Sequence, residues 1–177
     1  SVPLRHDEML FIIKHQTSEL WLKLMLHELR SARSLLREDD LRPALKRLAR
    51  VKYIQTQLTE QWSVLATLTP SEYAEFRRFL ATSSGFQSWQ YRAVEFMLGN
   101  KNRDMLPVFD HHPEAQQMLS TLLHEPSLYD EFLAYLHRQG HPIPADRLDR
   151  DWSEPYRFSA ELVPTFTAIY EHSHDHW

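Results

Sequence analysis

Near its start the chain carries the segment Phe11-Ile12-Ile13-Lys14-His15-Gln16-Thr17-Ser18-Glu19-Leu20-Trp21-Leu22-Lys23-Leu24. Its apolar spacing predicts a long helix, and the helical repeat places Phe11, His15 and Glu19 on one face. A neighbouring stripe consists of Leu10, Ile13, Leu20 and Leu24. We therefore expect the imidazole and an aromatic ring to share a face beside the core. Because a lone histidine in such a helix is more often a hydrogen-bonded core residue than a ligand, its role depends on the rest of the chain.

Length and composition bound the class of protein. The chain has 177 residues, enough for one domain with a substantial core, and we interpret residues 1–177 as that domain. It contains no cysteine, which excludes disulfides and thiolate metal sites and favours the cytoplasm. The formal net charge is −4, with basic and acidic residues interspersed, and no apolar run could span a bilayer. The expected partners are small molecules or other subunits, with neither nucleic acid nor a membrane.

The secondary-structure signals are helical throughout. Three glycines are few for a β-rich domain of this length, and no strand-like alternation could build a sheet. Capping residues, prolines and glycines predict a first helix from residues 7–8 to about 37 and a second that follows Asp40 and Pro43 and includes residues 48–65. Further helices are predicted from 70 to about 80, from about 84 to 98, 113–124, 126–138, and from 159–164 onward. The second helix is expected to bury the stripe Leu48, Val51, Gln55, Leu58, Trp62 and Leu65. The predicted fold class is all-α, a bundle of long antiparallel helices.

A second candidate face lies on the helix that follows Thr69-Pro70-Ser71-Glu72, which forms a capping box with proline at the first helical position. This helix carries Tyr73 and Arg77 four residues apart. An arginine there is most simply a side chain with a packed stem and a solvated head. The functional interpretation is a clamp for an anion, because guanidinium presents a planar fork to a carboxylate.

Histidines are numerous, eleven in all, but their spacing gives weak support for a metal site. His172 and His176 lie one helical turn apart, and His111 and His112 are adjacent. A solvated tail explains the terminal histidines better than a zinc site, which normally recruits a further ligand from elsewhere in the chain. No Glu-x-x-His pattern is repeated on two helices, so a di-iron bundle is not indicated.

Several longer blocks together resemble a known family. They are Asp7-Glu8-Met9-Leu10-Phe11-Ile12-Ile13, His15 to Leu24, Leu58-Thr59-Glu60-Gln61-Trp62, Ser84-Gly85-Phe86-Gln87-Ser88 and Gln90-Tyr91-Arg92. In this order they resemble the haem-dependent tryptophan 2,3-dioxygenases of bacteria, over essentially the whole chain. The resemblance implies an all-helical, cytosolic homotetramer with haem b. It implies an enzyme that opens the indole ring of L-tryptophan with O2 to give N-formylkynurenine, the first step of kynurenine-type tryptophan degradation.

The resemblance also implies roles for individual residues. His15 matches the catalytic-site histidine on the distal side of the haem, where it would meet the indole N–H. The substrate would lie against Phe11, Ile12, Ile13 and Lys14, while Arg77 would pair with its carboxylate next to Tyr73. Residues expected to line the haem pocket are Trp62, Leu80, Ser84, Gly85, Tyr91 and Arg92. Ferrous haem would activate O2, leaving binding and orientation to the protein.

The iron ligand has no match in the sequence. In the family, a further helical portion carries the proximal histidine and a threonine that contacts the substrate amine, and we assign no metal ligand within residues 1–177. We therefore expect residues 1–177 alone not to form a working haem site. Two other interpretations stay open: a catalytically incomplete helical module that binds tryptophan or haem, and a helical interaction subunit.

Overall fold

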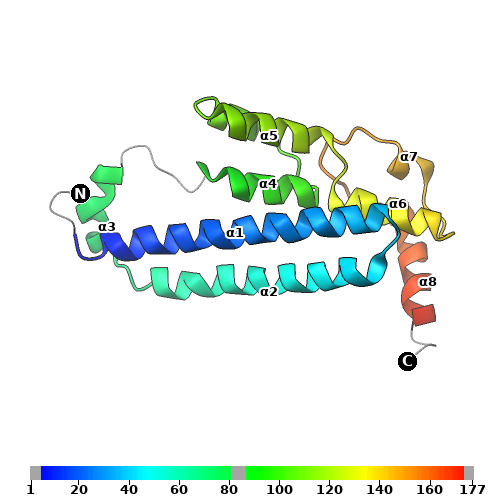
Figure 1. The fold of residues 1–177 in the computed structure, drawn as a ribbon, viewed down its shortest axis with the longest axis horizontal. Coiled ribbons are helices and arrows are strands. Elements are labelled where there is room, and N and C mark those ends of the chain that lie inside the picture. The colour runs from blue at the N-terminus through cyan, green and yellow to red at the C-terminus, as the bar shows by residue number, and fades with distance from the viewer. Residues whose placement is uncertain (1–4, 81–86, 174–177) are drawn as a thin grey trace.

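The computed structural model describes residues 5–80 and 87–173, and within them it contains helices and no strand, which confirms the all-α prediction (Figure 1). The α-helices are α1 (Glu8–Arg37), α2 (Leu41–Leu65), α3 (Pro70–Arg77), α4 (Trp89–Leu98), α5 (Pro113–His124), α6 (Leu128–Arg138), α7 (Ala145–Leu148) and α8 (Val163–Ser173). The 3₁₀ helices within the described residues include η1 (Arg78–Leu80), η3 (Arg103–Phe109) and η4 (Ala160–Leu162).

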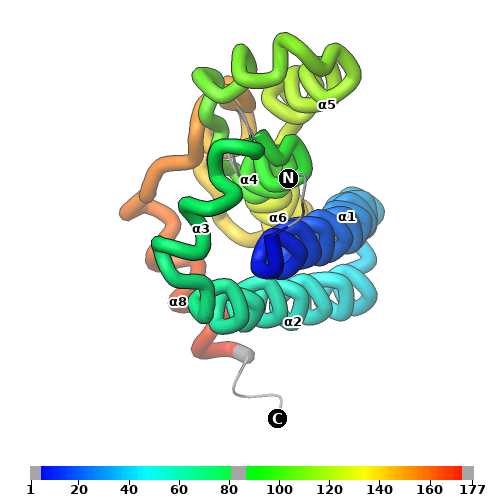
Figure 2. The backbone as a smooth tube through the Cα atoms, turned by 90° about the vertical axis from the view of Figure 1, so that its left-hand side faces the viewer, coloured from blue at the N-terminus to red at the C-terminus, as the bar shows by residue number. Residues whose placement is uncertain are grey.

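The long helix α1 is central to the fold. It pairs with α2 along their length as an antiparallel hairpin and contacts α4 and α6 on another side, while α5 packs on α4 (Figures 1 and 2). The short helix α3 lies at the end of the hairpin where α1 begins and α2 ends, and α8 lies at the opposite end (Figure 1). One core cluster joins α1, α2, α4 and α5, and a second joins the far end of the hairpin to α6 and α8.

The helix ends follow the capping chemistry of the sequence. The Thr69–Glu72 capping box is present at the start of α3, and Gly99 ends α4 in the left-handed conformation with φ of 101°. Helix α5 spans the predicted residues, whereas α6 begins two residues later than predicted, at Leu128. The predicted capping box of Ser84 and Gln87 falls partly outside the described residues. In the described part, the side chain of Ser88 caps α4.

The buried face of α1 differs from the predicted one. Its buried apolar residues are Leu22, Met25, Leu26, Leu29, Ala32 and Leu36. Ile13, Leu20 and Leu24 are instead 51%, 69% and 37% exposed. The reason is that α2, α4 and α6 all pack against the other sides of α1, so the stripe that was predicted beside the core faces outward. Helix α1 is therefore apolar on two faces, of which the described chain covers one.

The predicted stripe of α2 is correct in part. Val51 is buried, and Leu48 and Leu58 pack against the core. The polar Gln55 is exposed, and Ile54 next to it is buried in its place. Trp62, predicted to lie in the same seam, is 58% exposed. The seam therefore follows Leu48, Val51, Ile54 and Leu58 along the line where α2 faces α1.

Cationic side chains hold the turn between α5 and α6. The ammonium group of the buried Lys101 donates to three carbonyl oxygens at the end of α5, those of Leu122, Leu123 and Glu125. A cation there complements the helix dipole and satisfies carbonyls that lack helical partners. Burial is the main cause that lowers the pKa of Lys101 to about 8. From α1, Arg33 donates to the Pro126 carbonyl (3.2 Å) and to the Glu125 carboxylate (2.7 Å).

The start of α6 is fixed by a third cation. The Asp130 carboxylate closes a capping box with Ser127, accepting from its hydroxyl at 2.6 Å and from its backbone N–H at 2.8 Å. Arg150, from the connection after α7, donates to both oxygens of the same carboxylate at 2.9 and 3.2 Å. The side chain of Asp130 is 1% exposed and that of Arg150 is 13% exposed, so this ion pair is sheltered from water.

Replacing Asp130 tests this arrangement. Asp130→Ala leaves the largely buried guanidinium of Arg150 without its carboxylate and removes the side chain that closes the capping box of α6, so we expect a loss of about 3 kcal/mol of unfolding free energy in urea titrations. The control is Asp39→Asn, which removes the charge that pairs with Arg138 where the two side chains are 44% and 37% exposed, and keeps a residue that tolerates the φ of 60° at this position. That loss should be about 0–1 kcal/mol. Equal losses for the two variants would contradict the proposed importance of the buried pair.

Candidate active site

An aromatic cluster joins the first turns of α1 to α3. The Phe11 ring lies 4.2 Å from the His15 ring, 5.8 Å from Tyr73 and 5.6 Å from Phe76, measured between centroids. Tyr73 and Phe76 meet edge to face at 5.5 Å, and Phe76 is fully buried. The helical spacing of residues 11 and 15 and of residues 73 and 76 brings each pair to one side of its helix. Packing of α3 against α1 then assembles the four rings.

A hydrogen bond within α1 determines which nitrogen of the neutral His15 ring carries the proton. Nδ1 of His15 lies 2.8 Å from the carbonyl oxygen of Phe11. Because a carbonyl oxygen can only accept, Nδ1 carries the proton in this hydrogen bond. In the neutral imidazole, Nε2 is then the nitrogen with the lone pair, and it is able to accept a hydrogen bond from a ligand.

Arg77 and Leu80 lie beyond the aromatic cluster. Arg77 is the exposed last residue of α3, one helical turn after the half-buried Tyr73. Leu80 is half-buried at the end of η1. The guanidinium of the neighbouring Arg78 lies 4.7 Å from the Phe79 ring centroid. The end of α3 and the start of η1 thus carry one arginine each, and Arg78 contacts an aromatic ring.

Lys14 and Trp62 meet where α1 faces the last turn of α2. The Lys14 ammonium lies 3.9 Å from the centroid of the Trp62 ring, and burial lowers the pKa of Lys14. One turn later the Ser18 hydroxyl donates to Gln61 at 3.1 Å. A cation over an indole face is a favourable contact that holds the ring in place. Trp62 therefore has a defined orientation although more than half of its surface is exposed.

The remaining predicted site residues are scattered or undescribed. Ile12 is half-buried, while Ile13 projects from the opposite side of α1 to Phe11. Tyr91 is 45% exposed on α4, and Arg92 pairs with Glu95 at 2.5 Å. The structure does not bring these four residues into the aromatic cluster. Ser84 and Gly85 lie outside the described residues.

A groove of about 520 Å³ runs beside His15 between α1 and α4. Its lining consists of His15, Gln16, Glu19, Leu20, Lys23 and Gln90. The Gln90 amide nitrogen donates to the Glu19 carboxylate at 2.7 Å and to the Glu19 carbonyl oxygen at 2.9 Å. This groove combines an imidazole acceptor with apolar and charged groups, which are the features of a ligand site.

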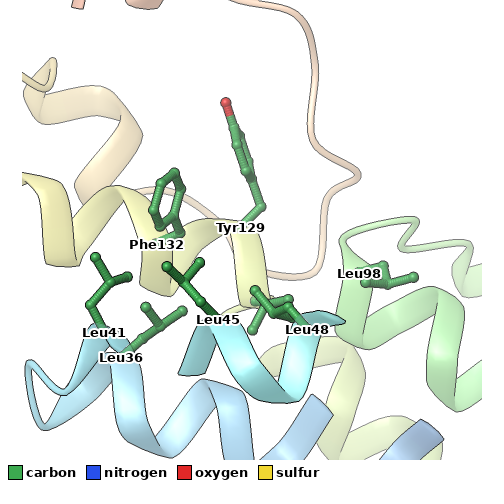
Figure 3. A pocket seen from close by; sticks show the side chains of 8 residues that line it. Leu36, Leu41, Leu45, Leu48, Leu98, Tyr129 and Phe132 are labelled. Atoms are coloured by element: carbon green, nitrogen blue, oxygen red, sulfur yellow. The ribbon is translucent and has the colours of Figure 1, made fainter. Parts of the chain in front are cut away.

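A second hollow, of about 400 Å³, opens between α2 and α6 (Figure 3). Its lining consists of Leu36, Leu41, Leu45, Leu48, Leu98, Leu128, Tyr129 and Phe132. Leu36 is 21 residues after His15 on the same helix, which is roughly 30 Å at the helical rise. The lining offers leucines and aromatic rings but no acidic or basic group, so it is unsuited to acid–base chemistry.

No group of three or more potential metal ligands occurs within the described part of the chain. Nδ1 of His172 donates to the Ala168 carbonyl at 2.7 Å, and Nδ1 of His112 accepts from the Ala115 N–H at the start of α5. His176 lies outside the described residues. His112 and His172 thus have structural hydrogen bonds.

Sequence reasoning missed three features of this region. Phe76 was not among the predicted site residues, although its spacing from Tyr73 was a signal for a shared cluster. The Lys14–Trp62 contact and the Glu19–Gln90 hydrogen bonds join residues that are 48 and 71 positions apart. Such pairs depend on how the helices pack, and no local spacing predicts them.

The fold and the site define an all-helical protein in which one histidine of the longest helix both lines a groove and contacts a cluster of aromatic rings. A family model described as tryptophan 2,3-dioxygenase matches residues 3–176, and the chain belongs to this family, as its sequence blocks predicted. Over all 177 residues it is 68% identical to the tryptophan 2,3-dioxygenase of Arthrobacter sp. (strain FB24) and 63% identical to that of Saccharopolyspora erythraea. The corresponding identity for the Serratia proteamaculans enzyme is 56%.

The chain spans 62% of the Arthrobacter protein and 63% of each of the other two. It therefore corresponds to less than two thirds of the length of these relatives. Among the described residues, no helix is both long enough and apolar enough to cross a membrane.

The pH dependence of α3 tests how the site is held. The Thr69 hydroxyl and the Thr69 N–H donate to the Glu72 carboxylate at 2.7 and 2.8 Å, and they lower its pKa from the ordinary value of 4.5. Because the pKa is lower in the folded state, this stabilisation is complete above pH 4.5 and is lost as the pH falls through the folded value. Carbon chemical shifts of α3 should report its fraying in acid.

Glu72→Gln is expected to remove this acid-dependent fraying, since an amide does not titrate. A variant that frays over the same pH range as the wild type would assign the effect to another carboxyl group.

Proposed function

We propose that this chain forms the substrate-binding part of a haem-dependent dioxygenase. The reaction is the opening of the indole ring of L-tryptophan by O2 to N-formylkynurenine. The observation that carries the proposal is the His15 hydrogen bond to the Phe11 carbonyl, which leaves Nε2 as an acceptor beside aromatic rings. An indole N–H is the donor that such an acceptor would bind. Family membership supports the same substrate and reaction.

The side chains present suit haem b as the cofactor. Trp62 exposes 58% of its surface next to Lys14, and Leu80 is half-buried after α3, so apolar groups are available to contact a flat macrocycle. When bound, ferrous haem supplies the activation of O2, which no amino-acid side chain provides. We propose Trp62 and Leu80 as its contacts, and Ser84, Gly85, Tyr91 and Arg92 on the family resemblance alone. No residue of this chain is proposed as the iron ligand.

The protein side chains bind the substrate and orient its indole ring. Phe11 and Tyr73 provide apolar walls for the indole ring, and Arg77 offers a fork to the substrate carboxylate. His15 accepts from the indole N–H and so fixes the rotation of the ring. We assign Ile12 and Lys14 to the edge of the pocket, and Ile13, which faces outward from α1 in this chain, on the family resemblance alone.

The proposed setting is a cytoplasmic homotetramer. The lack of cysteine in the chain agrees with a reducing compartment. The outward apolar stripe of α1 agrees with burial of this face in a larger assembly or a longer chain.

The proposal is tested with a family-length protein that contains this chain. The protein is reconstituted with haem, reduced, and supplied with L-tryptophan and O2, and N-formylkynurenine is measured by its absorbance. Product formation is expected. A protein that binds haem and tryptophan but forms no product would instead be a binding module, and failure to bind either would favour an interaction subunit.

Arg77→Met should raise the KM for L-tryptophan strongly. Loss of a desolvated, charge-assisted pair costs about 2–5 kcal/mol, and we expect kcat/KM to fall by the factor that corresponds to this free energy. Arg77→Lys should recover little because an ammonium lacks the planar fork. The measurement is steady-state kinetics, and an unchanged KM in Arg77→Met would remove this residue from the carboxylate site.

His15→Ala should keep measurable activity, because an acceptor for the indole N–H contributes about 1 kcal/mol, or about fivefold in kcat/KM. The matched probe is 1-methyltryptophan, which has no indole N–H and should bind the wild type and His15→Ala equally. L-tryptophan should bind the wild type more tightly. Complete loss of turnover in His15→Ala would instead identify an essential base.

A further inference from the structure

Glu19 lies one helical turn after His15 on the same face of α1. Its carboxylate forms a hydrogen bond with a side chain of α4 and not with one of its own helix. A glutamate and a lysine four residues apart commonly form an ion pair, and Lys23 has this spacing from Glu19. No ion pair between them occurs in the described part of the structure. The Glu19 carboxylate instead accepts from the Gln90 amide at 2.7 Å.

Gln90 binds both the side chain and the backbone of Glu19. Its amide nitrogen also donates to the Glu19 carbonyl oxygen at 2.9 Å, so both N–H bonds are directed at one residue. A contact with helical backbone is less adaptable than one with a mobile side chain, because the backbone cannot change rotamer. Gln90 is in the first turn of α4, just after its cap Ser88. The two hydrogen bonds therefore fix the start of α4 against one turn of α1.

These bonds form part of the groove in front of His15. Glu19 and Gln90 are both half-buried, and both line that groove together with the imidazole. Since His15 belongs to α1 and Gln90 to α4, the separation of these helices sets the width of the groove beside the imidazole. The substrate carboxylate would be held at Arg77. The width of the groove would then set the orientation of the indole ring at the other end of the molecule.

We propose that Glu19 and Gln90 are positioning residues that set the orientation of the indole ring relative to His15. This inference rests on the proposed function. The pair touches neither the reacting carbon atoms nor the carboxylate clamp at Arg77. Its loss is therefore expected to lower kcat and to leave the KM for L-tryptophan nearly unchanged.

The first test is Gln90→Leu in the haem-reconstituted, family-length protein. A misplacement of about 1 Å in a bound substrate can cost about 100-fold in rate, so we expect kcat to fall about 10- to 100-fold, with KM within about twofold of the wild type. The matched control is Gln116→Leu, which removes a similar glutamine-to-carboxylate hydrogen bond, to Asp110, at the distant start of α5. The two variants should have similar thermal unfolding midpoints, and Gln116→Leu should keep the wild-type kcat.

Exchange of the two functional groups separates positioning from general stability. Glu19→Gln keeps an acceptor oxygen for Gln90 and should retain kcat within about threefold, because one neutral hydrogen bond contributes little. Gln90→Glu opposes two carboxylates and should resemble Gln90→Leu. Combining Glu19→Gln with Gln90→Glu restores one amide-to-carboxylate hydrogen bond, and kcat should recover by about 3- to 10-fold over Gln90→Glu alone.

The outcomes that overturn the proposal are distinct. If the wild type is active and Gln90→Leu has the same kcat, the positioning role is contradicted and the proposed function is unaffected. A fall in kcat that the exchanged pair does not recover, or that Gln116→Leu shares, assigns the effect to stability. A haem-loaded wild type that forms no N-formylkynurenine contradicts the proposed function, and the positioning role for that reaction with it.

Discussion

The arrangement of the helices depends on cations that bind the turn between α5 and α6. Lys101, Arg33 and Arg150 come from three different parts of the chain, and together they satisfy backbone carbonyls and two carboxylates at this turn. The carbonyls at a helix end are costly to bury without donors, so the turn can be internal only with these partners. Because α5 packs on α4 and α6 packs on α1, the turn keeps α4 against α1. The groove beside His15 depends on that contact.

Much of the fold could be predicted from the sequence because capping chemistry is local. The box of Thr69 and Glu72, the left-handed Gly99 and the proline that opens α5 each define a helix end within a few residues. The orientation of α1 could not be predicted in the same way. Its apolar residues occupy two faces, and helical periodicity alone does not determine which face the neighbouring helices cover.

The candidate site shows the same division between local and tertiary information. The shared face of Phe11 and His15 follows from their spacing, and the 4.2 Å ring contact agrees with it. The contact of Tyr73 with Phe11 requires α3 to fold back onto α1 through the connection after α2. The local sequence of that connection does not predict how close the two helices come. The bond between Glu19 and Gln90 is more remote still, since it joins residues 71 positions apart through packing of two helices.

The hydrogen bonds of His15 and Glu19 together limit what the imidazole can do. A histidine that acts as a strong general base commonly has a carboxylate behind it, which orients the ring and stabilises its charged form. Among the described residues, His15 has no such partner, because its Nδ1 donates to the neutral carbonyl of Phe11. The acid nearest to it on the same helical face, Glu19, is bound to Gln90 instead. The geometry therefore favours an imidazole that accepts a hydrogen bond and orients its donor. The Glu19 carboxylate does not orient the imidazole and instead joins α1 to α4 at the groove.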